Sequence, residues 1–205
     1  MHKIQHITEK ELDLLNYFYE KKRGHVRQIK RAVQLSEHTL LKCLNSLEKR
    51  KLVSSQKEGN LKIYEVNPQN TLVKVFYSYF DADRLDALEF KRRKAVTMFV
   101  EGIKKTKIPY FILLFGSTAK GDYTPKSDID LIIAYDSIEK SLNERINELK
   151  KVILAETGLK ISSIAMELGE FLKEKENKQN YALQDAIISG YPAFGNQLYY
   201  EVMFG

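Results

Sequence analysis

One stretch constrains the fold most: two apolar runs joined by a polar loop that begins with glycine and serine and ends with paired aspartates. The first run, 111–115, leads directly into Gly116 and Ser117, and the second follows Asp128 and Asp130. Continuous apolar runs of this length are typical of strands buried on both faces. Because side chains alternate along a strand, the two aspartates are expected on one face. The stretch therefore predicts a strand, a tight turn, a loop and a second strand that presents two carboxylates.

The paired carboxylates predict a cation site. Like charges at that separation repel, and burying them unpaired is costly, so a cation bound between Asp128 and Asp130 accounts for them best. Mg²⁺ suits oxygen ligands on a rigid strand, because it takes one or two carboxylates and completes its octahedron with phosphate oxygens and water. The sequence therefore predicts an Mg²⁺ site at Asp128 and Asp130, beside a phosphate-bearing ligand.

The glycine-serine turn supplies the expected phosphate contacts. Gly116 lets the backbone approach a ligand closely, and backbone N–H groups with the Ser117 hydroxyl can hold phosphate oxygens, especially if a helix begins near 118–119. Lys120 and Lys126 in the following loop are further candidates, although loop lysines are usually solvated.

Together these residues resemble the signature of the DNA polymerase beta-like nucleotidyltransferase superfamily, in particular its minimal nucleotidyltransferases. The resemblance lies in the stretch GSTAKGDYTPKSDIDL and is carried by Gly116, Ser117, Gly121, Ser127, Asp128, Asp130 and Leu131. It implies Mg²⁺-dependent transfer of a nucleoside monophosphate from an NTP to a hydroxyl acceptor, with the nucleotide held by Gly116, Ser117, Lys120, Lys126 and Ser127. The alternative is a plain strand-turn-strand in which both aspartates are solvated turn residues.

The superfamily's full active site contains a third carboxylate, which the resemblance places on a neighbouring strand at 159–166. That segment reads LKISSIAM and has none: Ser162 or Ser163 stands at the position, and a hydroxyl is a poor metal ligand or general base. Glu167 lies just past the strand end and substitutes if the strand bends. Two interpretations stay open: a domain that only binds nucleotide or dimerises within a transcriptional regulator, or a working enzyme with the catalytic residues Asp128, Asp130 and Glu167.

The net charge of +6 is unevenly divided along the 205 residues. Residues 1–70 hold 14 Lys and Arg against 8 Asp and Glu, whereas residues 71–205 hold 19 of each. A basic N-terminal module beside an electrically balanced remainder predicts a polyanion as the partner of the first part.

The N-terminal pattern predicts three helices and a hairpin. Thr8 and Glu11 form a capping box for a helix that ends at Gly24, and a second helix follows at 26–33. Ser36 is a natural N-cap for a third helix, and the segment 53–66 alternates as a hairpin. This order resembles the winged helix-turn-helix of ArsR-like and MarR-like regulators over residues 5–67.

The resemblance implies a double-stranded DNA partner, with the third helix in the major groove and the hairpin wing on the backbone. The candidate groove contacts are Ser36, His38, Thr39, Lys42 and Asn45, and the candidate wing contacts are Lys57, Asn60 and Lys62. Lysines mainly contact phosphates and make binding salt-dependent. The alternative is a module for protein interaction or dimerisation.

We expect an α+β chain of three parts: a winged helix domain at 1–68, a helical linker at 69–107, and a nucleotidyltransferase domain at 108–205 with a small mixed β-sheet and flanking helices. Linker helices are expected at 71–80 and 84–105, and the basic run 91–94 is expected to be a solvated helix face. The aromatic side of the first linker helix suggests a homodimer interface. An antitoxin-like pairing with a helical, toxin-like partner is consistent with both interpretations of the domain.

Several classes are disfavoured. The chain has no apolar run near the length of a membrane helix. Its first residues are polar, unlike a signal peptide, so a cytoplasmic protein is expected. Cys43 is the only cysteine and is expected in the core. The four histidines all lie in the N-terminal module, away from the aspartates, which argues against a Ser-His-Asp or histidine-zinc site; they are His2, His6, His25 and His38. Neither a dinucleotide fingerprint nor a Walker motif is present.

Overall fold

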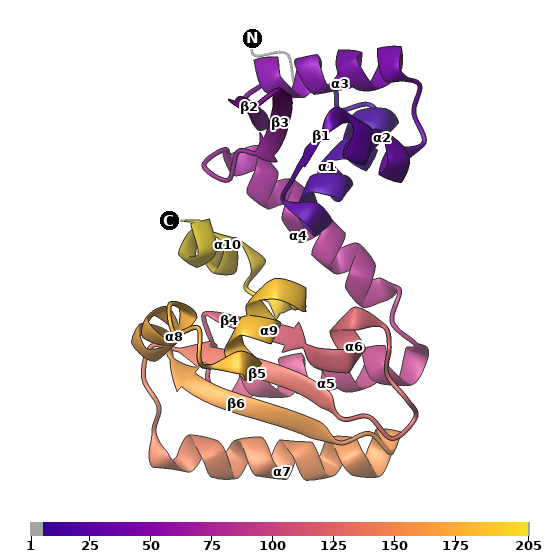
Figure 1. Ribbon diagram of the computed structural model, residues 1–205. Coiled ribbons are helices and arrows are strands. Elements are labelled where there is room, and N and C mark those ends of the chain that lie inside the picture. Colours follow the sequence, from indigo (N-terminus) through magenta and orange to yellow (C-terminus); the bar gives the residue numbers. More distant parts are fainter. Residues whose placement is uncertain (1–5, 205) are drawn as a thin grey trace. The chain divides into compact units, whose positions relative to one another are not determined.

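The computed structural model describes residues 6–204, so His2 lies outside the described part. The chain forms two compact units that divide between Phe80 and Asp81, inside helix α4 (Thr71–Asp86) (Figure 1). The division falls within the segment expected as a linker rather than at either of its ends. The sequence predicted an α+β chain, and the structure confirms this class.

The N-terminal unit has the predicted order of three helices and a hairpin. Its elements are α1 (Glu9–Lys21), β1 (Arg23–His25), α2 (Val26–Val33), α3 (Glu37–Lys49), β2 (Val53–Glu58) and β3 (Leu61–Val66). The capping box between Thr8 and Glu11 is present, and Ser36 caps α3 by accepting a hydrogen bond from the Thr39 N–H at 3.3 Å. Its core is built from one face of each helix, including the fully buried Leu14, Phe18, Ile29, Leu40, Leu44 and Leu47.

One strand of this unit was not expected. β1 pairs antiparallel with β3, which makes a sheet in the order β1-β3-β2. Gly24 was predicted to end the first helix but lies inside β1, where a Cβ would collide with the Tyr17 hydroxyl. The helix instead ends at Lys21, and its C-cap residue Lys22 has a φ of 64°. Close packing, not helix termination, therefore explains this glycine.

The C-terminal unit is a four-stranded mixed sheet with helices around it. From α5 onward its elements are α5 (Phe90–Thr106), β4 (Phe111–Phe115), α6 (Gly116–Lys120), β5 (Ile129–Tyr135), α7 (Lys140–Thr157), β6 (Ile161–Glu167), α8 (Leu168–Lys175), α9 (Tyr181–Ser189), β7 (Tyr191–Phe194) and α10 (Asn196–Phe204). The strand order is β6-β5-β4-β7; β5 and β6 are parallel, and the other pairs are antiparallel. β7 was not expected, because its four residues sit between two glycines and include a proline.

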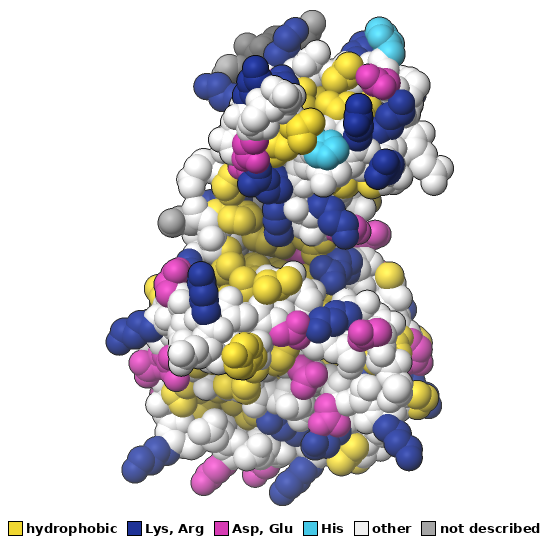
Figure 2. Space-filling model, viewed as in Figure 1, with side chains coloured by type: hydrophobic (Ala, Val, Ile, Leu, Met, Phe, Trp, Pro, Cys, Tyr) yellow, Lys and Arg dark blue, Asp and Glu magenta, His cyan; other side chains and the backbone are white. Residues whose placement is uncertain are grey.

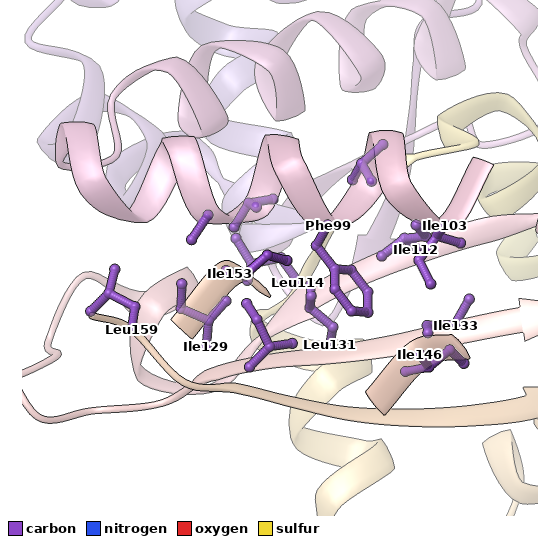
Figure 3. Packing of buried hydrophobic residues seen from close by; sticks show 14 of the residues in the cluster. Phe99, Ile103, Ile112, Leu114, Ile129, Leu131, Ile133, Ile146, Ile153 and Leu159 are labelled. Atoms are coloured by element: carbon purple, nitrogen blue, oxygen red, sulfur yellow. The ribbon is translucent and has the colours of Figure 1, made fainter. Parts of the chain in front are cut away.

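One face of this sheet packs on α5 and α7. Ile112 and Leu114 of β4 join Ile129, Leu131 and Ile133 of β5 in a buried cluster that is completed by helix residues such as Phe99, Ile103, Ile146 and Ile153 (Figure 3). Because side chains alternate, Asp130 lies on the opposite face of β5 from this cluster. α5, which was expected as part of a linker, therefore belongs to the core of this unit. Among the described residues, no helix is both long and apolar enough to cross a membrane.

Candidate functional site

The glycine turn and the second aspartate meet in the C-terminal unit. Asp130 pairs with Phe115, the last residue of β4, so the turn that follows β4 begins beside its carboxylate. Gly116 has a φ of 68°, and a Cβ there would collide with Oδ2 of Asp130. A glycine is needed for both reasons, the left-handed backbone and the close approach. The structure thus brings Gly116, the first residue of the turn, against the Asp130 carboxylate.

The two carboxylates, Asp128 and Asp130, affect each other's charge and attract a lysine. Burial raises the pKa of Asp130, and the neighbouring Asp128 raises it further, while a hydrogen bond with Ser162 and the charge of Lys160 oppose the rise. Lys160 donates a hydrogen bond from Nζ to Oδ2 of Asp128 at 2.6 Å. Two carboxylates that attract an ammonium group can also serve as ligands of a divalent cation. Sequence reasoning did not single out Lys160, because its approach depends on the pairing of β5 with β6.

The loop between the turn and the aspartates is held by a buried arginine. Arg92 is 2% exposed and donates hydrogen bonds to Thr118 Oγ1 at 2.8 Å and to the carbonyls of Thr124 and Ser127 at 2.8 and 3.1 Å. Its guanidinium also lies 4.0 Å from the centre of the Tyr123 ring. The expectation that the run 91–94 is a solvated face is wrong at this residue, because this one side chain of the run points into the loop.

The predicted phosphate contacts differ in their partners. Ser127 accepts a hydrogen bond from the Thr124 N–H at 2.9 Å, so its hydroxyl shapes the loop. Lys120 pairs with Asp185 of α9 at 2.7 Å, and Lys126 is exposed in the loop. Asp185 also raises the pKa of Asp130, although less than burial does. No sequence pattern pointed to Asp185, which lies 55 residues after Asp130 on a separate helix.

The third carboxylate is not where the resemblance placed it. Ser162 pairs with Asp130 in the parallel register of β5 and β6, while Glu167 pairs with Tyr135, five residues further along. At about 3.3 Å per residue, that separation is about 16 Å. Glu167 accepts a hydrogen bond from the Ile138 N–H at 3.4 Å. The structure therefore contradicts the expectation that Glu167 joins the site, because the register of β6 stays regular up to Glu167 instead of bending.

The donor set is accordingly two carboxylates. Within residues 6–204, no group of three or more His, Cys, Asp or Glu side chains is arranged to hold a metal ion. Mg²⁺ needs no such group when substrate phosphates and water fill its remaining positions. Asp128 and Asp130 fit that requirement.

The predicted DNA contacts of the N-terminal unit are mostly exposed. His38, Lys42 and Asn45 follow one another at helical spacing on the outer side of α3, opposite its buried leucines. Thr39 is half-buried, and Ser36 is engaged in the helix cap. Figure 2 shows many Lys and Arg side chains over this unit and few Asp and Glu. A groove of about 850 Å³ runs between α1 and α3, lined among others by His6, Lys10, His38, Lys42, Lys49 and Arg50.

The wing residues are close together. Lys57, Asn60 and Lys62 line one shallow pocket of about 260 Å³ on the hairpin. Lys62 already has partners for its positive charge, since its ammonium pairs with Glu48 at 3.2 Å and lies over the Tyr64 ring. Of the two wing lysines, Lys57 is therefore the better placed to meet an external phosphate.

One comparison with known proteins concerns the C-terminal unit. Residues 96–188 match the family model described as nucleotidyltransferase domain, and this range runs from within α5 to α9 and includes Gly116, Asp128 and Asp130 but not Arg92. A search of curated proteins finds no match.

Two solved structures are similar at low identity. BpsR of Bordetella bronchiseptica, whose DNA binding is regulated by 6-hydroxynicotinic acid, is 14% identical over 50% of this chain and 78% of its own, with a TM-score of 0.33. The archaeal chromatin protein TrmBL2, described with a novel mode of DNA binding, is 13% identical over 88% of this chain and 74% of its own, with a TM-score of 0.30. TM-scores this low do not establish a shared fold.

Proposed function

We propose that the C-terminal unit is an Mg²⁺-dependent nucleotidyltransferase that moves a nucleoside monophosphate from an NTP to a hydroxyl acceptor. The match over residues 96–188 supports the class of reaction. The observation that supports the site is the close approach of Gly116 to Asp130, because it puts the turn that we expect to bind phosphate beside one of the two proposed metal ligands.

Each residue of the site has a proposed role that follows from its position. Asp128 and Asp130 would hold the cation, which when bound neutralises triphosphate charge and lowers the pKa of a hydroxyl nucleophile. The Ser117 hydroxyl and the backbone of the turn bind phosphate oxygens. Arg92 orients the loop that carries Ser127 and Asp128, since it holds the carbonyl of Ser127. Lys126 is exposed in the loop, where its positive charge can attract the triphosphate.

The test is release of pyrophosphate from labelled NTPs in the presence of Mg²⁺. We expect Asp128→Asn together with Asp130→Asn to lower the rate by about 10³-fold or more, because electrostatic stabilisation at the phosphoryl group is lost. Asp136→Asn is the matched control, since Asp136 follows the other end of β5 and pairs with Lys107. Equal rates for the wild type and the double variant would overturn the proposal.

A second function is favoured by one observation: Ser162, not a carboxylate, stands beside Asp130. In that case the unit binds nucleotide without turning it over and acts as the sensor of a regulator. Nucleotide binding measured by calorimetry, together with the absence of pyrophosphate release, would favour this function over the first.

We further propose that the N-terminal unit is a winged helix that binds double-stranded DNA through α3 and the hairpin. The exposed stripe His38, Lys42 and Asn45 supports this, as does the basic excess of residues 1–70. Fluorescence anisotropy with duplex DNA over a salt series tests it. A binding constant that does not change with salt would contradict phosphate contacts by these lysines.

A further inference from the structure

Lys160 contributes a basic side chain to the proposed cation site. It stands one residue before β6, and its carbonyl accepts a hydrogen bond from the Ile129 N–H at 2.9 Å. Because Ile129 pairs with Ile161, the preceding residues Lys160 and Asp128 lie across from each other. Its ammonium lies 2.6 Å from Oδ2 of Asp128.

The contact between Lys160 and Asp128 affects how a cation can bind at the site. Ser162 supplies a hydroxyl rather than a carboxylate beside Asp130, so the two aspartates carry the negative charge that faces Lys160. A divalent cation at Asp128 would lie within a few ångströms of a positive charge that repels it.

The Lys160 side chain has room to move. The Lys160 side chain is 69% exposed, whereas Asp128 is 32% exposed and fixed at the start of a buried strand. The lysine can therefore swing into solvent while the carboxylate stays in place.

We propose that Lys160 is a built-in competitor for the divalent cation, occupying Asp128 when the site is empty and leaving it when metal and nucleotide bind. This inference rests on the proposed function of Asp128 and Asp130 as metal ligands. Metal alone then binds weakly. An NTP-metal complex binds better, because the triphosphate offers the released ammonium a new anionic partner.

The experiment is a titration of the full chain with Mn²⁺ in the absence of nucleotide, with free Mn²⁺ measured by electron paramagnetic resonance. We expect Lys160→Met to bind Mn²⁺ about tenfold more tightly than the wild type, since a neighbouring positive charge is removed. Lys107→Met is the matched control. It deletes the same charge and breaks a Lys–Asp pair of 2.9 Å at the opposite end of β5, so its Mn²⁺ affinity should equal that of the wild type.

The outcomes separate this inference from the function on which it rests. Unchanged or weaker Mn²⁺ binding by Lys160→Met, with binding that still requires Asp128 and Asp130, overturns the competitor and leaves the metal site intact. An equal gain in Lys107→Met also overturns it, because net charge alone would then explain the effect. Binding that is the same in the Asp128→Asn and Asp130→Asn double variant overturns the metal site itself, and the competitor with it.

Discussion

The two units place their candidate residues in opposite ways. In the N-terminal unit, His38, Lys42 and Asn45 lie exposed on one regular helix, and their relative positions follow from helical spacing. In the C-terminal unit, each part of the site depends on a distant contact, such as Arg92 with Ser127 or Lys160 with Asp128. Substitutions in the first unit should therefore alter binding with little change in stability. Substitutions in the second should alter folding and chemistry together.

The largest effect is expected at Arg92. Replacing Arg92 by Met removes the donor to the buried Thr118 hydroxyl and to the carbonyl of Ser127, and one of the two donors to the carbonyl of Thr124, which should lower the free energy of unfolding by about 3 kcal/mol. Arg93→Met is the control, because Arg93 is partly exposed and its pairing with Asp86 at 3.9 Å should contribute less than about 1 kcal/mol. Urea denaturation measures both. Similar losses in the two variants would remove the contrast between the units.

The next effect concerns the glycine turn. Gly116 and Gly121 both have positive φ angles, 68° and 80°, so alanine strains the backbone at either site by about 1 kcal/mol. Only at position 116 does the added Cβ also displace Asp130, so Gly116→Ala should lower the free energy of unfolding by about 2 kcal/mol. It should also stop pyrophosphate release, while Gly121→Ala, with open space around the Cβ, remains active. Loss of activity in both variants would indicate that the turn conformation, not the contact with Asp130, matters.

A carboxylate at position 162 should sharpen the cation site. Ser162→Asp would put a third acidic oxygen donor beside Asp130, and we expect Mn²⁺ affinity to rise about tenfold. Ser162→Asn has the same shape without the charge and should leave the affinity near that of the wild type. No gain in the aspartate variant would show that the register of β6 does not aim residue 162 at the metal.

A smaller effect is expected for DNA binding. Lys42→Ala should weaken duplex binding about threefold and reduce the slope of log K against log salt by about 0.9, as for one lost phosphate contact. Lys62→Ala should change both quantities less, because Lys62 already pairs with Glu48. Thermal unfolding of the two variants should match the wild type. A larger effect at Lys62 would move the interface from the helix to the wing.

The smallest effect is the pH response of Glu11, a buried acid of the N-terminal unit. Burial opposes its ionisation, but hydrogen bonds from Ser46 and Thr8 and the charge of Arg50 outweigh it, so the pKa of Glu11 lies below the usual 4.5. Its ionised form therefore stabilises the fold above pH 4.5, and this contribution is lost as the pH falls through the lowered pKa. The stability difference between the wild type and Glu11→Gln, measured in urea, should shrink between about pH 6 and about pH 3. A constant difference would contradict the pKa shift.

Local patterns located most of the elements. The Thr8 capping box, the Ser36 cap and the apolar spacing of α2 and α3 act within a few residues, so they could be recognised without a structure. β1 escaped detection because its three residues, RGH, carry no apolar alternation and form a strand only by pairing with β3. The continuous helix α4 also differs from the break expected near 80, since the buried Asp81 continues the helix while it accepts hydrogen bonds from Asn196 and Tyr200.

The sequence by itself determined the α+β class, the glycine-serine turn, the two aspartates and the exposed stripe of His38, Lys42 and Asn45, because spacing along the chain fixes which side chains share a face. Only the tertiary structure decided which distant residues meet at the site. The parallel register of β5 and β6 sets Ser162 and Lys160, rather than Glu167, beside the aspartates, and the packing of α5 turns Arg92 inward. Strand register and helix packing depend on the whole core, whose contacts join residues far apart in the sequence.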